Sequence, residues 1–210
     1  MAFFISIEGP DGSGKTTAAK RLVKKLGEEG FDVFYTREPG GSYIAEQIRK
    51  VILDKKNTGM DDKTEVLLYA ASRRQHLMDK ILPAIKNNTT VICDRFIDSS
   101  LAYQGYARKI GIDEVLRINL FAIENFMPNF TIFFDITPED ALKRIKKNKR
   151  EVDRLDAEEL DFHNNVYQGY LHVISRFPER FKVIDASLDE DAVFENIYSI
   201  VKGLLNGSNQ

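Results

Sequence analysis

Short apolar runs alternate with longer amphipathic stretches along most of this chain. The apolar runs are hydrophobic on both faces, as strands are when helices cover both sides of a sheet. They predict strands at Phe3–Ile7, Asp32–Thr36, Thr90–Asp94, Phe130–Asp135 and Phe181–Asp185. The amphipathic stretches predict helices at Lys15–Glu29, Ile44–Asp54, Asp62–Ile85, Asp113–Phe126, Pro138–Lys147, Glu158–Phe177 and Asp189–Leu205. Strands that alternate with helices require right-handed crossovers, so the pattern predicts a doubly wound α/β fold with a parallel sheet.

Charged and glycine-rich segments follow most of the predicted strands. They are Glu8–Asp11, Arg37–Gly41, Asp94–Phe96 and, more weakly, Asp185–Ser187. In sheets of this type, ligands bind beyond the carboxyl ends of the strands. We therefore expect the functional site at this edge of the sheet.

The composition is that of one globular domain, which we expect to span residues 1–210. Of the 210 residues, 43% are hydrophobic and 30% are charged, enough for a sizeable core. The net charge of −2 gives no general attraction to nucleic acids or anionic membranes, so neither is an expected partner. Cys93 is the only cysteine, which excludes an internal disulfide. No signal peptide or bilayer-spanning stretch is evident, so we expect a cytoplasmic protein.

A phosphate-binding loop follows the first predicted strand. Residues 9–16 read GPDGSGKT and match the pattern G-x-x-x-x-G-K-[ST], with a predicted helix after them. The glycines let backbone N–H groups surround the phosphates, and the helix N-terminus adds partial positive charge. Lys15 is expected to reach the β- and γ-phosphates of ATP, and the Thr16 hydroxyl is expected to ligate Mg²⁺. The nucleotide-binding residues predicted here are Gly9, Pro10, Asp11, Gly12, Ser13, Gly14, Lys15, Thr16 and Thr17.

The same residues exclude two other classes of nucleotide-binding protein. A dinucleotide fingerprint would need a third glycine after Gly12 and Gly14, where Thr17 stands. A GTPase would carry an Asn-Lys-x-Asp guanine-reading motif after a later strand, and the sequence has none. The open question is which molecule accepts the phosphoryl group.

Two charged residues at the end of the third predicted strand are further catalytic candidates beside Lys15. Asp94 stands where a second carboxylate can face the metal hydration shell, although a helix cap would also explain it. Arg95 suits a transferring phosphoryl group or an acceptor phosphate through bidentate contacts. The alternative for Arg95 is a salt bridge to Asp94 or Asp98.

Five motifs resemble those of one enzyme family. The segment 94–105, DRFIDSSLAYQG, closely resembles the acceptor-site signature of thymidylate kinases. Residues 8–17 resemble the family's P-loop and residues 36–41 its second loop, with further matches at residues 67–74 and 153–156. The motifs occur in the same order as in the family and span nearly the whole chain. They resemble most closely the motifs of the bacterial type. The resemblance implies a P-loop NTPase fold with a five-stranded parallel sheet in the order 2-3-1-4-5, ATP-dependent phosphorylation of dTMP to dTDP, and a homodimer.

The resemblance implies roles for several helical residues on the acceptor side. Tyr69 would stack on the thymine ring, although a core aromatic would look the same. Arg73, one helical turn later, could donate to a base carbonyl. Ser100 and Gln104 form another i, i+4 pair, and the Gln104 amide can both donate and accept, as a pyrimidine edge requires. Capping of a helix start would explain Ser99 and Ser100 equally well.

The remaining acceptor residues would hold the sugar and the phosphate. By the resemblance, Tyr103 would exclude a ribose 2′-hydroxyl, and Asp11 would accept a hydrogen bond from the 3′-hydroxyl. Arg37 and Arg95 would grip the acceptor phosphate, and Glu38 would steady the site by charge pairing.

The segment from Lys143 to Arg154 is rich in lysine and arginine. A solvated helix face would explain it, but the resemblance predicts a mobile lid over ATP at about residues 143–156. Closure of such a lid would bring a cation onto the transferring phosphate and exclude water. Arg150 is the expected catalytic cation, with Lys149 and Arg154 as substitutes, and Arg144 is expected to stack on adenine.

Other readings remain open on the sequence alone. The chain could phosphorylate another deoxynucleotide or a deoxynucleoside, or it could be a non-catalytic ATP-binding switch. The histidines at positions 76, 163 and 172 lack metal-ligand spacing, so we expect structural or surface roles for them.

Overall fold

The computed structural model describes residues 2–147, 154–155 and 158–207. A parallel five-stranded sheet in the order β2-β3-β1-β4-β5 forms its centre. The strands are β1 Phe4–Glu8, β2 Val33–Arg37, β3 Thr90–Asp94, β4 Phe130–Asp135 and β5 Phe181–Asp185. The predicted strand order is confirmed, and the predicted bounds of β1 and β2 are displaced by one residue.

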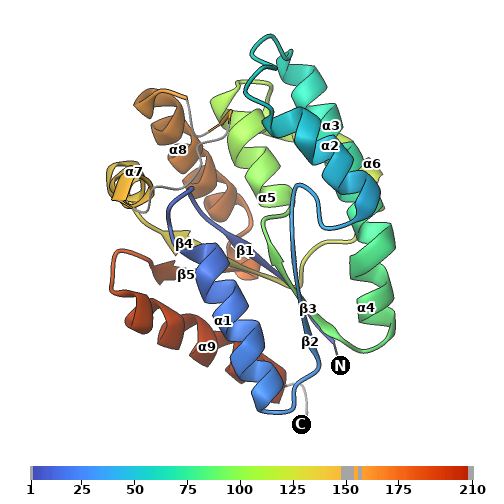
Figure 1. The fold of residues 1–210 in the computed structure, drawn as a ribbon, viewed down its shortest axis with the longest axis vertical. Coiled ribbons are helices and arrows are strands. Elements are labelled where there is room, and N and C mark those ends of the chain that lie inside the picture. Colours follow the sequence, from blue (N-terminus) through green and yellow to red (C-terminus); the bar gives the residue numbers. More distant parts are fainter. Residues whose placement is uncertain (1, 148–153, 156–157, 208–210) are drawn as a thin grey trace.

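Helices cover both faces of this sheet, with α1 and α9 on one side and α3, α6 and α8 on the other (Figure 1). The α-helices are α1 Lys15–Glu28, α2 Tyr43–Leu53, α3 Asp62–His76, α4 Leu82–Lys86, α5 Ile97–Ser100, α6 Ile112–Ile123, α7 Pro138–Lys147, α8 Leu160–Arg176 and α9 Glu190–Gly207. Two π-helical segments, η1 Leu77–Ile81 and η2 Leu101–Ala107, extend α3 and α5, and a 3₁₀ turn, η3 Pro178–Arg180, precedes β5.

Side chains alternate along each strand and therefore feed two separate cores. In β1, Phe4 enters the core under α3, α6 and α8, while Ile5 and Ile7 enter the core under α1 and α9. In β4, Phe133 and Phe134 divide in the same way. Because the strands carry apolar residues on both faces, helices pack against both sides of the sheet, as the sequence pattern predicted.

The long helix predicted at Asp62–Ile85 is interrupted. The chain forms α3, then the π-helical turn η1, then the short α4. Pro83 stands at the start of α4 and lacks the N–H that would bond to the carbonyl four residues earlier, so the helix widens just before it.

The helix formed by α5 and η2 has no counterpart among the helices predicted by periodicity. All of its residues except Tyr106 are buried, the polar Ser100 and Gln104 as well as the apolar Ile97 and Leu101. A helix with a single exposed residue has almost no amphipathic pattern, so periodicity does not detect it.

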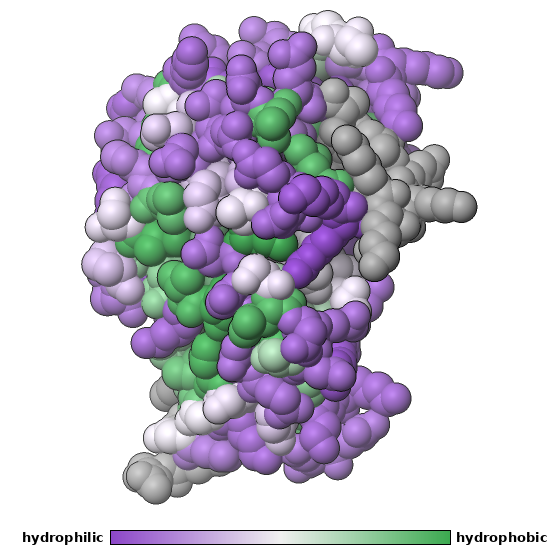
Figure 2. Space-filling model, turned by 90° about the vertical axis from the view of Figure 1, so that its left-hand side faces the viewer, coloured by the Kyte–Doolittle hydropathy of each residue, from purple (hydrophilic) through white to green (hydrophobic). Residues whose placement is uncertain are grey.

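The side of the molecule that carries α7 and α8 has a group of hydrophobic residues across its middle, with hydrophilic residues above and below (Figure 2). Within the described ranges, each helix is either too short or too polar to cross a membrane.

Candidate active site

A pocket of about 130 Å³ lies where the carboxyl ends of β1, β2 and β3 meet. It is lined by Asp11, Lys15, Thr16, Arg37, Glu38, Pro39, Arg49, Leu53, Tyr69, Asp94, Arg95, Ser99, Tyr103, Gln104 and Leu155. Most residues predicted for the acceptor side are therefore neighbours in space. Arg73 and Ser100 do not line the pocket, and their predicted contacts with a base stay predictions.

The P-loop glycines adopt positive φ angles that other residues rarely adopt. Gly12 has a φ of +84°, and a Cβ there would lie 2.3 Å from the carbonyl oxygen of Ala141. Gly14, at φ +88°, leads directly into α1, whose first N–H groups have no side-chain cap. Ser13 Oγ is buried and, among the described residues, has no hydrogen-bond partner. An unpaired hydroxyl beside an uncapped helix N-terminus fits the phosphates of ATP.

Lys15 is buried in this loop and points toward the pocket. Its Nζ donates to the carbonyl of Pro10 at 3.1 Å and lies 3.7 Å from Asp11 Oδ1. Burial, and then the nearby charge of Arg95, lower the pKa of the Lys15 ammonium. A bound triphosphate would add negative charge beside this buried cation and favour its charged form.

The predicted metal ligands contact each other. The Thr16 hydroxyl donates to Asp94 Oδ2, and the described residues contain no group of three histidine, cysteine or carboxylate side chains that could hold a metal by themselves. Mg²⁺ at nucleotide sites takes one or two protein oxygens and draws its other ligands from phosphates and water. The pair therefore fits Mg²⁺ carried in with a nucleotide.

Arg95 is held in place by four neighbours. Its Nη2 donates to Asp11 Oδ1 at 2.9 Å and to the Tyr103 hydroxyl at 3.3 Å. Its Nη1 donates to Ser99 Oγ at 3.0 Å and to the Tyr170 hydroxyl at 2.9 Å. The ion pair is with Asp11. The alternative expected from the sequence, a salt bridge from Arg95 to Asp94 or Asp98, is wrong, because the left-handed backbone of Arg95 at φ 71° turns its side chain toward the P-loop.

Glu8, at the end of β1, joins the P-loop to the elements that support Arg95. Its carboxylate accepts from the N–H of Phe96 at 2.7 Å, from Ser99 Oγ at 2.6 Å and from the Tyr170 hydroxyl at 3.0 Å. Burial, followed by repulsion from Asp98, raises the pKa of Glu8 to about 7. Tyr170 was not predicted as a site residue, because a tyrosine on the apolar face of a helix looks like ordinary core.

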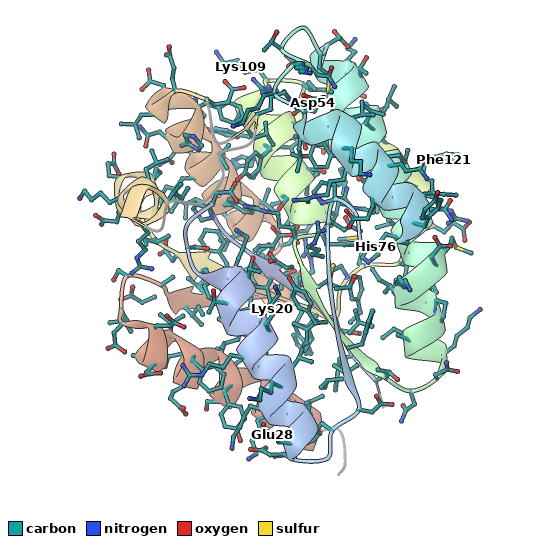
Figure 3. All side chains as sticks on the ribbon, viewed as in Figure 1. Lys20, Glu28, Asp54, His76, Lys109 and Phe121 are labelled. Atoms are coloured by element: carbon teal, nitrogen blue, oxygen red, sulfur yellow. The ribbon has the colours of Figure 1, made fainter. Side chains whose placement is uncertain are left out.

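A second buried carboxylate, Glu38, braces the loop after β2. Its Oε2 accepts from Arg73 Nε at 2.7 Å, and its Oε1 pairs with His76 Nδ1 at 2.9 Å. His76 lies inside the molecule (Figure 3), and its Nε2 is 2.6 Å from Thr36 Oγ1. The predicted charge pairing of Glu38 is therefore with Arg73, and the structural role expected for His76 is confirmed.

Arg73 links this loop to the acceptor-site helix. Besides Glu38, it donates from Nη1 to Ser100 Oγ at 3.1 Å and to Asn119 Oδ1, and from Nη2 to the carbonyl of Phe96 at 2.9 Å. Arg73 thus fixes the relative positions of the two loops that carry the pocket arginines.

Arg37 and Arg49 lie at the mouth of the pocket. Arg37 Nη2 pairs with Glu46 Oε1 at 2.9 Å, and Arg49 Nη1 donates to the carbonyl of Pro39 at 2.8 Å. Inside the pocket, the Tyr103 hydroxyl donates to Asp11 Oδ2 at 3.0 Å. The pocket thus combines the cationic Arg37 and Arg49 with the polar Asp11 and Tyr103, a lining that suits a phosphate and a sugar.

A second cavity, of about 280 Å³, lies beside the P-loop on the side of α9. Arg144 of α7 lines it and donates to the carbonyl oxygens of Ala186 at 2.8 Å and Ser187 at 3.1 Å. The cavity, which we call the donor groove, is lined by Gly12, Ser13, Gly14, Thr17, Ala18, Arg144, Leu188, Asp189, Glu190 and Val193. The sequence predicted Arg144 and the glycines here but not Leu188 or Val193, which lie far from any motif.

The predicted lid is described only in part. Arg150 and Lys149 lie outside the described residues. Arg154 donates from Nε to the carbonyl of Ile52 at 2.9 Å and from Nη2 to Glu65 Oε2. In this structure Arg154 is therefore held by α2 and α3.

Comparisons with known proteins agree with this geometry. A family model described as thymidylate kinase matches residues 7–197. Thymidylate kinases from Geobacillus sp. (strain WCH70) and Clostridium novyi (strain NT) are each 58% identical, over 97% and 95% of this chain and 98% of each relative. The chain belongs to the thymidylate kinase family.

A solved structure extends the likeness to the fold. The crystal structure of a thymidylate kinase from Ehrlichia chaffeensis has a TM-score of 0.77 and 30% sequence identity, and the match covers 96% of this chain and 98% of that one. The resemblance inferred from the five motifs, the P-loop fold and the kinase class are thereby confirmed.

The structure also brings out two buried residues to which sequence reasoning gave no part in the site. Glu65 and His76 lie on the same helix as Tyr69 and Arg73, and all four recur at helical spacing. A stripe of polar residues on the buried face of α3 was the signal that could have revealed them.

Proposed function

We propose that this chain transfers the γ-phosphoryl group of ATP to the 5′-phosphate of dTMP, giving dTDP and ADP. One observation carries the proposal: Lys15 of the P-loop shares a single pocket with Arg37 and Arg95, which come from two different loops. A donor phosphate beside Lys15 and an acceptor phosphate beside the arginines would then lie close together. The names and high identity of the family's bacterial members support dTMP as the acceptor.

The residues of the pocket divide the work by position. Lys15 and Arg95 would neutralise charge on the transferring group, since both are buried near where it must pass. Mg²⁺, held by Thr16 and Asp94, would stabilise charge on the β- and γ-phosphates. Asp11 fixes both Arg95 and Tyr103. Tyr103 would exclude a ribose 2′-hydroxyl and so favour a deoxyribose.

An ADP-release assay over nucleoside monophosphates and free nucleosides tests the proposal. We expect dTMP to give the highest kcat/KM. A higher value for another monophosphate or for thymidine would overturn the substrate assignment. Binding of ATP without turnover on any acceptor would instead support a non-catalytic switch.

We also propose that the enzyme works as a homodimer through the face formed by α2, α3 and α6. Phe121 is 88% exposed and Tyr43 is 83% exposed, and Leu67 on α3 is also exposed. Phe121, on α6, lies at the outer edge of the molecule (Figure 3). Such a group of exposed hydrophobic residues is typical of an interface.

Light scattering after gel filtration tests the dimer. We expect the wild type to elute as a dimer and Phe121→Glu as a monomer. Leu171→Glu, on α8 away from this face, is the matched control and should leave the dimer intact. A monomeric wild type at micromolar concentration would overturn the proposal.

A further inference from the structure

A third buried carboxylate, Glu65 of α3, contacts the residue predicted to read the base. Glu65 and Gln104 are each 1% exposed. Glu65 Oε1 accepts a hydrogen bond from Gln104 Nε2 at 2.8 Å. Gln104 also lines the acceptor pocket next to Tyr69, which stands one helical turn after Glu65. Neither the sequence motifs nor the relatives assign a function to Glu65.

The ion pairs of Glu65 prevent its carboxylate from turning. Arg154 Nη2 donates to Oε2, and Arg108 Nη2 lies 3.7 Å from the same oxygen. Arg154 is itself anchored to the carbonyl of Ile52. Oε1 is therefore left to face Gln104, and a carboxylate oxygen in such pairs can only accept.

This contact fixes the orientation of the Gln104 amide. An amide has a donating nitrogen and an accepting oxygen, and only the nitrogen can face a carboxylate. Turning the amide by 180° would bring Gln104 Oε1 against Glu65 Oε1, two buried acceptors with no hydrogen between them. Among the residues that the structure describes, no donor is paired with Gln104 Oε1, so that oxygen remains available to a ligand in the pocket.

We propose that Glu65 is a specificity-determining positioning residue that holds Gln104 so that its amide oxygen accepts the N3–H of thymine. The second hydrogen of Gln104 Nε2 is then free to donate to an adjacent base carbonyl. Cytosine presents an acceptor at N3 and a donor at N4, the reverse pattern. To pair with cytosine the Gln104 amide would have to turn, and Glu65 opposes that turn.

The discrimination acts on the hydrogen-bonding edge of the base, so it separates thymine and uracil from cytosine. It does not separate thymine from uracil, which have the same N3–H and carbonyl groups. The inference rests on the proposed function, because it assumes that a pyrimidine monophosphate enters this pocket.

Glu65→Gln tests the inference, because a neutral amide at position 65 can face Gln104 in either orientation. The ratio of kcat/KM for dTMP to that for dCMP should fall by about tenfold or more, the size of one buried hydrogen bond. Dissociation constants for the two monophosphates without ATP should show the same change. If the role of Glu65 were purely structural, kcat/KM would fall equally for both substrates and the ratio would not change.

Asp62→Asn is the matched control. Asp62 is an exposed carboxylate on the same helix, 3.6 Å from the guanidinium of Arg108, and no contact joins it to Gln104. We expect this variant to keep the wild-type ratio. A fall equal to that of Glu65→Gln would mean that loss of charge near Arg108, and not orientation of the amide, changes the ratio.

Two further variants sharpen the test, and the first of them keeps it decisive if Glu65→Gln folds poorly. Gln104→Met removes the amide and should lose at least as much discrimination as Glu65→Gln. Glu65→Gln added to Gln104→Met should then have no further effect on the ratio. Wild-type discrimination in Gln104→Met, or additive losses in the double variant, would overturn the inference.

The wild type in the same assay separates the two ways of failing. If the wild type does not use dTMP, the proposed function is wrong. If it uses dTMP and rejects dCMP while Glu65→Gln rejects dCMP equally well, only the role of Glu65 is wrong.

Discussion

The acceptor pocket and the donor groove share the P-loop, yet they are built in different ways. Around the acceptor pocket, side chains from several elements hold one another through the buried carboxylates Glu8, Glu38 and Glu65. The donor groove is formed largely by the glycine backbone of the P-loop, with Arg144 gripping main-chain carbonyls after β5. The acceptor side is thus shaped before ligand arrives, and its shape depends on specific partners.

The difference follows from what each side must recognise. Triphosphates are recognised by backbone N–H groups, which every sequence with the right glycines can offer. A base and a monophosphate are distinguished by side chains in fixed orientations, and a buried charged group keeps its orientation only when it is paired. Substitutions on the acceptor side should therefore disturb chemistry and stability, and those on the donor side should mainly weaken ATP binding.

The largest effect is expected at Arg95. Arg95→Ala should lower kcat by a factor on the order of 10³, because a cation beside the transferring group is lost. Binding of ATP, measured by calorimetry, should be almost unchanged. Arg176→Ala, which removes an exposed arginine paired with Asp113, is the control and should keep full activity. Near-normal turnover in Arg95→Ala would show that Arg95 has no catalytic role.

Glu38 should give the largest change in stability. Glu38→Gln leaves Arg73 buried without its countercharge and should lower the free energy of unfolding by about 3 kcal/mol. Glu114→Gln, in the exposed pair with Arg117, should change it by about 0.5 kcal/mol or less. Urea denaturation measures both, and equal losses in the two variants would contradict the bracing assigned to the acceptor side.

Glu8 should make stability depend on pH. Its pKa in the folded protein is about 7, against an ordinary 4.5, so the folded state binds the proton more tightly. The resulting stabilisation is fully present below pH 4.5 and is lost as the pH rises through about 7. The stability of the wild type relative to Glu8→Gln should therefore fall across this window, by at most about 1.4 kcal/mol per pH unit. Parallel pH curves for the two proteins would rule this out.

The smallest effect is expected in the donor groove. Arg144→Ala should raise the KM for ATP by about threefold to fivefold, as the loss of a stacked cation does at a partly exposed site. The KM for dTMP should not change. If the KM for dTMP rose while that for ATP stayed constant, the assignment of the two cavities would have to be reversed.

Local patterns in the sequence were sufficient for the fold and for the parts of the site that are contiguous. Apolar runs predicted the strands, and the P-loop motif predicted the cradle, because each depends on residues close together in the chain. Periodicity missed the helix of α5 and η2 because all of its residues but Tyr106 are buried. Its residues were still singled out, since their string resembled a family signature.

The sequence by itself determined that this chain forms a P-loop α/β sheet and belongs to the thymidylate kinases. Only the tertiary structure decided which residue braces which: Glu8 with Tyr170, Glu38 with His76, and Glu65 with Gln104. The physical reason is that parallel strands out of chain order bring distant segments together, and burial then obliges each charged group to find a partner there. No local pattern encodes that choice.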